Sequence, residues 1–471
     1  MKNTPGVIAA LLLTLFTAVP AFAAERKPNV LFIIVDDLTT TLGCMGDAQV
    51  HTPHMDALAA RGVRFDHAYT QFALCNPSRC SFLTGCYPER TKVFDLVTSL
   101  RGGLPKEVTL PQHFKNNGYV AGRIGKVFHV PDPKTKLDVE LGAPLHKDTA
   151  LFEDAKAAND PDDKPRGTAK GEGFNRAWAA SLKSATEFTD YQIASDAIST
   201  LEQFKDKPFF LAVGFIRPHT PYVAPKPFFD AIDKAKLTLP PFYRESGENV
   251  SKMPPSALRA NNNVFRYEAP TRDEAREATQ AYLAATGFVD SQVGRVLARL
   301  KELHLDENTI VVLTGDHGYH LGEHGLWAKQ TLFERGTHVP LIVAAPGVKP
   351  GVRDGLVEQV DIYPTLCDLA ALPLPKHLQG RSLKPMLDDP TAKGKQVAIS
   401  TMVSTRTKLT GHGVRTDAFR YIQWDEDGGE QLYDLRTDPD ELHNLAAQPA
   451  QAERMNRMRQ RLAAHLKAVT Q

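Results

Sequence analysis

The sequence has almost no net charge and few long apolar runs. Its 471 residues include 56 Lys and Arg against 55 Asp and Glu, a formal net charge of +1. Because basic and acidic residues are almost equal in number, the composition gives no reason to expect nucleic acid as a partner. Beyond residue 23, no stretch stays apolar over the roughly 20 residues of a membrane span, so we expect no stable membrane insertion. Internal repeats and low-complexity tracts are also missing, which excludes a repeat architecture.

Cysteine is scarce and odd in number, with residues Cys44, Cys75, Cys80, Cys86 and Cys367. In an oxidising compartment an odd count leaves one thiol without a partner. The other four could pair, and the sequence alone does not decide whether they do. Cys367 lies in an apolar segment, where a buried and inert thiol is expected.

The N-terminal segment has the pattern of a secretory signal. Lys2 precedes an apolar run over residues 7–20, and Ala21-Phe22-Ala23 has the small-x-small form of a cleavage site. A retained anchor is the alternative, but the run is shorter than the roughly 20 residues of a span. We therefore expect removal of residues 1–23 and export of the mature protein, to the periplasm in a bacterium with two membranes.

Four apolar segments of strand length each end in polar residues. With 42% hydrophobic residues, the chain can bury a large α/β core and a smaller appended domain. The apolar segments and the polar residues that follow them are 29–35 with 36–37, 119–124 with 125–129, 208–215 with 217–221, and 309–314 with 315–318. Open α/β sheets place their sites at the carboxyl ends of strands, so we expect these polar groups to form one constellation.

The remaining segments predict helices, loops and a second domain. Residues 52–62, 191–204 and 272–303 have helical signals, and the last two have the apolar faces of helices that cover a sheet. Residues 132–175 and 240–270 read as loop-rich excursions at the mouth of the site, with surface linkers as the alternative. From about residue 386 the pattern predicts strands over 413–424 and 430–435 and an amphipathic terminal helix. We therefore expect a signal peptide (1–23), a catalytic domain (24–385) and a C-terminal subdomain (386–471) with a small antiparallel sheet.

The stretch from Cys75 to Gly85 carries the most specific motif. It reads C-x-P-S-R followed by L-T-G. Pro77 and Ser78 suit the first turn of a short helix that Gly85 would end, with Arg79 one turn along from Cys75. A lone cysteine here would be a structural thiol, but the whole motif in register favours a functional one.

These segments together resemble the type I sulfatases of the alkaline phosphatase superfamily, and within them the iduronate 2-sulfatase type. The resemblance covers nearly all of the mature length and rests on residues 35–38, the Cys75 motif, 125–129, 217–221 and 315–329. It implies a large mixed, mostly parallel sheet flanked by helices, with a smaller C-terminal α+β domain. It also implies that a formylglycine-generating maturase oxidises Cys75 to formylglycine, which would make Cys75 the odd thiol.

The resemblance further implies a metal site with five ligands, which are Asp36, Asp37, Asp316, His317 and an oxygen of the converted Cys75. Calcium accepts carboxylate oxygens readily, so the three aspartates fit Ca²⁺. His317 stands where many sulfatases have asparagine. A nitrogen ligand weakens the case for calcium and leaves Mg²⁺ or a transition metal open.

The formylglycine hydrate is the expected nucleophile. It presents two hydroxyls on one carbon, so that one attacks sulfur and the other later expels the sulfate. In this hypothesis Arg79 and the metal lower the pKa of the first hydroxyl, and Asp316 takes its proton.

Two lysines and two histidines complete the expected catalytic set. Lys126 and Lys329 would neutralise the sulfate oxygens, His219 or Lys329 would protonate the leaving oxygen, and His129 would take the proton of the second hydroxyl. Alone, each would be an ordinary surface residue. Their assignment depends on the Cys75 motif.

For the other histidines and aromatic residues, the sequence gives less evidence of a role in the active site. We expect His320 and His324 to orient metal ligands from a second layer. Tyr319 and Trp327 could line a sugar site or lie in the core. The remaining candidates, which we expect to be structural, are His51, His54, His67 and His113.

The function expected from all this is hydrolysis of a sulfate ester, the 2-O-sulfate of iduronate or another uronate in a sulfated polysaccharide such as a glycosaminoglycan. A phosphonate or phosphate monoester hydrolase is the first alternative, although residues 125–129 and 327–329 favour sulfate. A non-catalytic carbohydrate-binding relative is the second. Such a relative would lack a nucleophile, metal ligand or lysine, and none is missing here.

Overall fold

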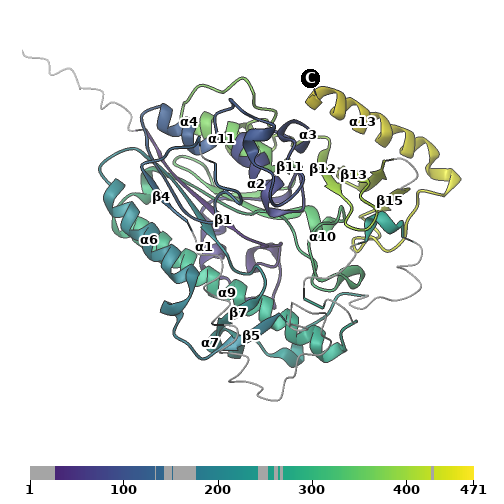
Figure 1. Cartoon of the computed structure of the whole chain (residues 1–471), viewed down its shortest axis with the longest axis horizontal. Coiled ribbons are helices and arrows are strands. Elements are labelled where there is room, and N and C mark those ends of the chain that lie inside the picture. The colour runs from purple at the N-terminus through teal and green to yellow at the C-terminus, as the bar shows by residue number, and fades with distance from the viewer. Residues whose placement is uncertain are drawn as a thin grey trace, which may run out of the picture.

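The computed structural model describes residues 27–132, 134–142, 151, 177–241, 253–258, 264–265, 269–425 and 429–470. Within these residues nine strands form the main sheet, in the order β10-β2-β9-β8-β1-β6-β3-β4, with β11 beside β2 (Figure 1). The strands are β1 Asn29–Val35, β2 Val63–Tyr69, β3 Val120–Gly125, β4 Val139–Leu141, β6 Phe209–Phe215, β8 Thr309–Gly315, β9 His338–Ala344, β10 Gly351–Arg353 and β11 Val357–Glu358.

Strand β1 lies at the centre of this sheet. It pairs in parallel with β6 on one side and β8 on the other, and β6 pairs in parallel with β3. Strand β9 is antiparallel to both of its neighbours, β8 and β2. Every residue of β1, β6 and β8 is buried, because helices cover both faces of the sheet. The sheet is thus mixed but mostly parallel, as the sequence predicted.

Helices pack on both faces of the sheet. On one face lie α1 Pro53–Arg61, α6 Thr189–Phe204 and α9 Arg272–Glu302, which share a hydrophobic cluster with Leu31 and Ile33 of β1. On the other face lie α2 Cys75–Thr84, α4 Leu110–Asn116 and α11 Ile362–Leu369, which pack on Val30 and Phe32 of the same strand. The alternation of side chains along β1 therefore supplies both halves of the core.

Several short elements connect these layers. Strand β5 Trp178–Ser181 pairs with β7 Tyr222–Pro225 in a separate two-stranded sheet. The short α-helices are α3 Pro88–Thr91, α7 Lys226–Asp230, α10 Glu334–Thr337 and α12 Lys384–Asp388. The 3₁₀ helices are η1 Gly43–Met45, η2 Leu100–Gly102, η3 Ala185–Glu187, η4 Lys234–Lys236, η5 Pro255–Ala257, η6 Asp306–Asn308, η7 Glu323–Gly325, η8 Gln359–Asp361 and η10 Pro449–Gln451.

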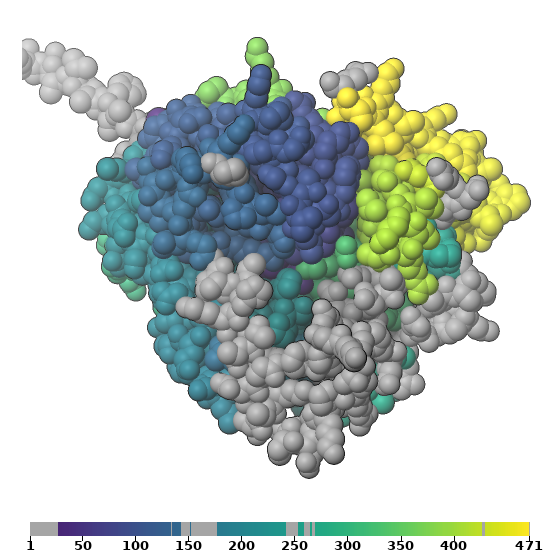
Figure 2. All heavy atoms as spheres, in the orientation of Figure 1, coloured from purple at the N-terminus to yellow at the C-terminus, as the bar shows by residue number. Residues whose placement is uncertain are grey.

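The C-terminal region forms an antiparallel sheet of its own. Its strands are β12 Ala398–Val403, β13 Thr410–Arg415, β14 Phe419–Trp424 and β15 Glu430–Asp434, and the terminal helix α13 Ala452–Thr470 packs on them. This region makes up one side of the molecule (Figure 2, light green to yellow). The single strand predicted over 413–424 is wrong, because the chain reverses between β13 and β14. Thr416 closes that turn, with its Oγ1 accepting a hydrogen bond from the Phe419 N–H at 3.0 Å.

Most other predicted elements are confirmed within a few residues. The helix over 52–62 is α1, and the two long helices are α6 and α9. Helix α2 begins at Cys75 and ends at Thr84, and Gly85 caps it with φ 66°. The signal segment 1–23 and most of the excursions 132–175 and 240–270 lie outside the described residues.

The described residues also bear on cysteine pairing and membrane spans. All five cysteines lie within the described ranges, and each is a free thiol, so the pairing that the sequence left open is not formed. No helix in the described part of the chain combines the length and apolarity needed to cross a membrane.

Strands β3 and β6 approach too closely at their carboxyl ends for a side chain at Gly214. A Cβ there would overlap the carbonyl group of Lys126. We predict that Gly214→Ala lowers the free energy of unfolding by about 1–3 kcal/mol, because backbone must move to admit the methyl group. Urea unfolding measures the loss. Gly102→Ala, whose Cβ has open space, is the control, and equal stability of the two variants would contradict this view of the strand contact.

Candidate active site

Several segments of the main sheet bring charged groups to Cys75. Because β3, β1 and β8 run parallel and lie close together in the sheet, their carboxyl ends reach the same edge. Helix α2 begins at that edge with Cys75, whose side chain is 1% exposed. The residues that follow the three strands are Asp36, Asp37, Lys126, Asp316 and His317.

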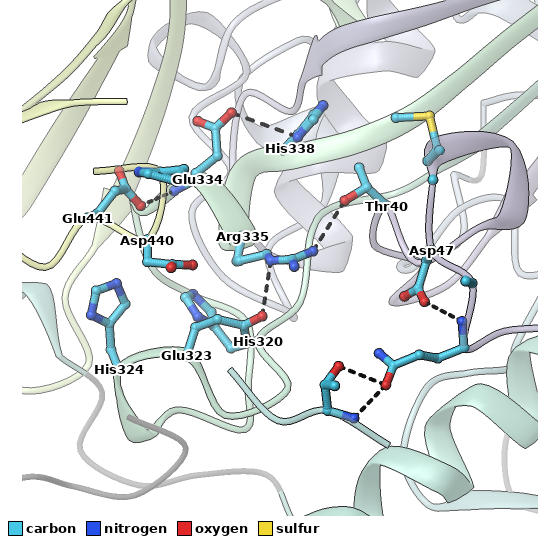
Figure 3. A pocket seen from close by; sticks show the side chains of 16 residues that line it. Thr40, Asp47, His320, Glu323, His324, Glu334, Arg335, His338, Asp440 and Glu441 are labelled. Carbon is cyan, nitrogen blue, oxygen red and sulfur yellow. Dashed lines mark hydrogen bonds and ion pairs between the residues drawn. The ribbon is translucent and has the colours of Figure 1, made fainter. Parts of the chain in front are cut away.

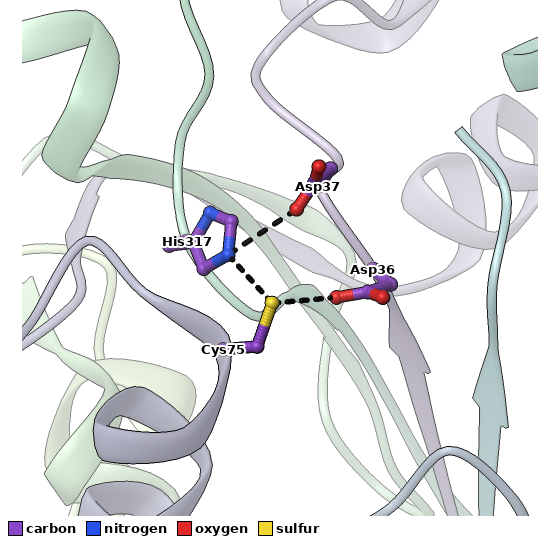
Figure 4. Close-up of side chains that lie close together, drawn as sticks. All are labelled: Asp36, Asp37, Cys75 and His317. Carbon is purple, nitrogen blue, oxygen red and sulfur yellow. Dashed lines mark hydrogen bonds and ion pairs between the residues drawn. The ribbon is translucent and has the colours of Figure 1, made fainter. Parts of the chain in front are cut away.

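The sulfur of Cys75 contacts three other groups. It lies 3.3 Å from Asp36 Oδ1, 3.3 Å from His317 Nε2 and 3.1 Å from the ammonium group of Lys329. Figure 4 shows Asp36 and His317 on two sides of the sulfur, and Asp37, from the same segment as Asp36, pointing toward His317. Sequence positions separated by up to 254 residues therefore meet at one atom.

Four of the five predicted metal ligands form a compact set. One ligand atom from each of Asp36, Asp37, Cys75 and His317 lies within 4.8 Å of the others, and all four residues are buried. The second carboxylate oxygen of Asp37, Oδ2, is buried and has no hydrogen-bond partner among the residues that the structure describes. Buried carboxylate oxygens and an imidazole nitrogen at this spacing fit a divalent cation.

Asp316, the fifth predicted ligand, lies at the margin of this set. Its Oδ1 accepts a hydrogen bond from the backbone N–H of Asp37 at 3.0 Å and lies 3.5 Å from His317 Nε2. Its Oδ2 accepts from Arg79 Nε at 3.0 Å. Burial and the neighbouring Asp36 raise the pKa of Asp316, so it accepts a proton more readily than an exposed aspartate.

Arg79 contacts all three segments that follow strands β1, β3 and β8. Its guanidinium group is 1% exposed and pairs with Asp36 at 3.2 Å as well as with Asp316. It also donates to the carbonyl groups of Lys126 and Val127. A planar guanidinium group with fixed donors suits this bridging position.

The two lysines neutralise the two carboxylates that follow β1. Lys126 pairs with Asp36, and Lys329 Nζ lies 2.5 Å from Asp37 Oδ1. Burial alone would lower the pKa of each ammonium group, but the carboxylates outweigh it and raise both. Burial would raise the pKa of Asp36, yet the charges of Lys126 and Arg79 hold that pKa well below its ordinary value.

The thiol of Cys75 is a poor nucleophile in this setting. Burial and the adjacent Asp36 raise its pKa far above that of a free cysteine. Since the thiolate is the reactive form of cysteine, the unmodified side chain would be almost inert here.

His129 and His219 lie within range of the charges of the site. Burial is the main reason that the pKa of each falls from 6.5 to about 4, and nearby lysines lower it further. Both rings are therefore neutral near pH 7. His219 Nδ1 lies 2.7 Å from the carbonyl oxygen of Thr220, which places the proton on Nδ1 and leaves Nε2 as an acceptor.

Two residues that the sequence did not single out hold the site in place. Gln359 donates to the carbonyl oxygen of Gly315 at 2.6 Å and accepts from Ser78 at 3.3 Å, so it ties β8 to helix α2. Asp190 accepts hydrogen bonds from the backbone N–H groups of Ile216, at 2.7 Å, and of Arg217, at 3.1 Å, in the segment that carries His219. A glutamine and an aspartate at helix starts carry no distinctive sequence signal.

The weaker candidates take other positions. His320 Nε2 lies 2.7 Å from Thr331 Oγ1, and the His324 ring stacks on Phe333 with centroids 4.2 Å apart. Figure 3 shows both histidines in the wall of a separate cavity. Tyr319 and Trp327 have 0% exposure and belong to a core cluster, so the alternative that they line a sugar site is wrong.

Comparison with known families identifies the class of enzyme. The family model described as Sulfatase matches residues 28–372, and the one described as N-sulphoglucosamine sulphohydrolase, C-terminal, matches residues 322–468. The chain belongs to the sulfatase family and is a sulfuric ester hydrolase. Enzymes of this family generally use a metal ion and a formylglycine.

Individual relatives agree with this family. The chain is 35% identical to a sulfatase of Formosa agariphila, over 89% of this chain and 83% of the relative. It is 31% identical to the human iduronate 2-sulfatase, over 93% and 94%. Among solved structures, a phosphonate monoester hydrolase of Silicibacter pomeroyi aligns with a TM-score of 0.79 and 26% identity, over 93% of this chain and 95% of that one. The expected alkaline-phosphatase-like fold is confirmed.

The lowered pKa values of His129 and His219 predict acid-sensitive stability. Because each folded-state pKa is about 4 against 6.5 for an ordinary imidazole, the unfolded chain binds more protons between these values. The stability that these two neutral imidazoles contribute is therefore fully present above pH 6.5 and is lost as the pH falls through about 4. We predict that His219→Gln makes the fall in melting temperature over this range shallower than in the wild type. Scanning calorimetry at several pH values measures both slopes, the range above pH 7 serves as the control, and identical slopes would contradict the assignment.

Proposed function

We propose that this enzyme removes the 2-O-sulfate of iduronate or another uronate in a sulfated polysaccharide, with formylglycine made from Cys75 as its reactive group. Hydrolysis of a sulfate ester follows from the family. The human relative is named iduronate 2-sulfatase, and it aligns over almost all of both chains, which supports the substrate class. The observation that carries the mechanism is the meeting of Asp36, His317 and Lys329 at the Cys75 sulfur.

The surroundings of Cys75 suit an oxygen nucleophile better than a sulfur one. When formed, the hydrated aldehyde supplies one oxygen for attack on sulfur and a second for release of sulfate. The Cys75 sulfur occupies the place on Cβ that an oxygen takes after conversion. The ammonium group of Lys329 lies 3.1 Å from that position. Arg79 forms ion pairs with Asp36 and Asp316 and so keeps both carboxylates beside it.

The lysines stabilise negative charge in the reaction, and the histidines take part in proton transfer. Lys126 and Lys329 remain protonated and stabilise the negative charge that develops on the sulfate oxygens. The departing alcohol takes its proton from Lys329, or from His219 once that ring has gained a proton on Nε2, because the neutral ring carries its only proton on Nδ1. His129 is neutral near pH 7 and accepts the proton that is lost when sulfate is released.

The residues around Cys75 fit a calcium ion as the metal. Asp36, Asp37, Asp316 and His317 would hold it with an oxygen of the converted Cys75, and the unpartnered Oδ2 of Asp37 gives it a further donor. A bound divalent cation supplies charge stabilisation of the sulfate oxygens and lowers the pKa of a hydroxyl near it. Carboxylates favour calcium, while the imidazole leaves magnesium as the alternative.

Burial of Cys75 sets the order of maturation and folding. At 1% exposure, with its thiol pKa raised, Cys75 in the folded chain is out of reach of another enzyme. A maturase must therefore act on the chain before helix α2 packs on the sheet. Export through the signal at residues 1–23, to the periplasm, fits a polysaccharide substrate that is too large to enter a cell intact.

A substrate panel tests the proposed specificity. We predict that 2-O-sulfated uronate disaccharides give the highest kcat/KM, and that the same disaccharides sulfated only on the glucosamine are slower by at least about 100-fold, since a site built for one ester rejects a displaced one. Release of inorganic sulfate, followed by ion chromatography, measures both rates. Equal rates on the two positional isomers would contradict the substrate class while leaving the sulfatase activity intact.

The phosphonate monoester hydrolase neighbour favours one competing function. That protein shares the fold with a TM-score of 0.79. Paired assays with an aryl sulfate and an aryl phosphonate separate the two readings, and faster phosphonate cleavage would make the alternative the better description.

Metal binding gives an independent test of the site. We predict one calcium ion per chain in dialysed protein, and an affinity lower by at least about 100-fold in Asp37→Asn, more than the 10- to 100-fold typical of losing an outer partner of a ligand. Mass spectrometry of the metal content and calorimetric titration measure the two quantities. Asp434→Asn, on the C-terminal sheet, is the control. Unchanged calcium affinity in Asp37→Asn would contradict the ligand assignment.

A further inference from the structure

Lys329 differs from the other charged groups of the site in how the chain carries it. Asp36, Lys126 and Asp316 each follow a strand of the main sheet directly, and Arg79 lies within helix α2. Lys329 instead lies in the irregular segment 326–333, between η7 and α10. Neither a strand nor a helix sets its backbone, so its position must come from individual contacts.

The contacts near Lys329 bind this segment to the main domain. The carbonyl oxygen of Ala328 accepts from the His320 N–H at 2.9 Å, and the Gln330 N–H donates to the carbonyl oxygen of Ala73 at 2.9 Å. Ala73 lies two residues before Cys75, so the segment is matched to the start of helix α2. Gln330 adopts φ 65°, a left-handed conformation that a non-glycine residue holds only when its surroundings enforce it.

Two polar contacts hold the far end of the segment: the Thr331 Oγ1 lies 2.7 Å from His320 Nε2, and a second contact comes from the C-terminal sheet. Arg420, on β14, is 1% exposed and donates from its guanidinium group to the carbonyl oxygen of Leu332 at 2.9 Å. Leu332 is three residues after Lys329. We propose that Arg420 is a positioning residue for catalysis, which holds segment 326–333 so that Lys329 reaches the Cys75 sulfur and Asp37.

Two acidic side chains lie against Arg420. Its guanidinium group pairs with Glu334, the first residue of α10, and its Nε lies 3.0 Å from Glu441 Oε1 without the geometry of a hydrogen bond. Glu441 also accepts from the backbone N–H of Glu334 at 2.6 Å, a contact that Figure 3 shows at the edge of the cavity. The end of segment 326–333 is therefore clamped between a C-terminal strand and a C-terminal loop.

A small shift of this segment is enough to affect the reaction. The ammonium group of Lys329 stands 3.1 Å from the Cys75 sulfur at the end of a flexible four-carbon stem. Misplacement of a catalytic group by about 1 Å can cost on the order of 100-fold in rate. The C-terminal sheet thus contributes to the active site without touching the substrate.

A double-mutant cycle between Arg420 and Lys329 tests the proposal, which rests on the proposed role of Lys329. We expect Arg420→Met to lower kcat for an aryl sulfate by about 10- to 100-fold per folded molecule, with KM changed by less than about threefold. In a Lys329→Ala background, Arg420→Met should lower kcat by less than about twofold more, because the group it positions is already gone. Arg420→Lys should recover part of the loss, and it replaces Arg420→Met in the cycle if the latter does not fold.

Arg415→Met is the matched control. Arg415 is buried on the adjacent strand and pairs with the same Glu334, at 3.1 Å. Its guanidinium group also donates to the carbonyl group of Thr416 and lies over the ring of Tyr69, both of which are outside segment 326–333. We expect this variant to melt at a lower temperature while its folded fraction keeps kcat within about threefold. Equal losses of kcat in both arginine variants would overturn the proposal. So would a loss of kcat on Arg420→Met that is as large in the Lys329→Ala background as in the wild type. A wild-type enzyme without sulfatase activity would instead refute the proposed function itself.

Discussion

The structure depends on balancing two buried negative charges at the end of its central strand. Asp36 and Asp37 both have 0% exposure, and a buried carboxylate without a partner costs several kcal/mol. Lys126, Lys329 and Arg79 supply the compensating charge. Asp36 is paired with both Lys126 and Arg79, whereas Lys329 is the one of these three cations that pairs with Asp37, so loss of Lys329 would leave Asp37 without a cationic side chain from this set. The groups proposed for catalysis therefore also stabilise the buried carboxylates at the end of the strand.

The apolar core makes this arrangement possible at short range. Strands β1, β6 and β8 are buried over their whole length, and close packing of helices on both faces leaves their ends little freedom to move. Glycine at positions 125 and 214 then lets β3 and β6 meet without side chains between them, which brings Lys126 to Asp36. The scaffold thereby fixes the charges before any substrate or ion arrives.

The C-terminal sheet is part of the same electrostatic system. Glu334 accepts from Tyr69 of the main sheet at 2.6 Å and pairs with Arg415 and Arg420 of the C-terminal one. Arg420 then reaches segment 326–333, which carries Lys329. The domain boundary at residue 386 stays a prediction, and the contacts of Arg415 and Arg420 with Glu334 and segment 326–333 cross it.

The apolar runs of the sequence predicted the fold class and the four site strands, and the Cys75 motif predicted helix α2. The prediction that His317 and Lys329 belong with Cys75 came from the resemblance to the sulfatases, because Lys329 follows no apolar run that would mark it. The sequence did not predict Gln359, Asp190 or Arg420, since each acts through a backbone group of a segment distant in sequence, and no local pattern marks such a contact. The hairpin of β13 and β14 was missed for a related reason. Its turn at residues 416–418 contains neither glycine nor proline, the usual signals of a reversal.

The most direct test of the account is the mass of the tryptic peptide that contains position 75, taken from active protein made in its native host. The account predicts an aldehyde in place of the thiol, seen as the lighter mass and as a product with a hydrazide probe, in proportion to specific activity. An unmodified thiol at position 75 in fully active enzyme would contradict it.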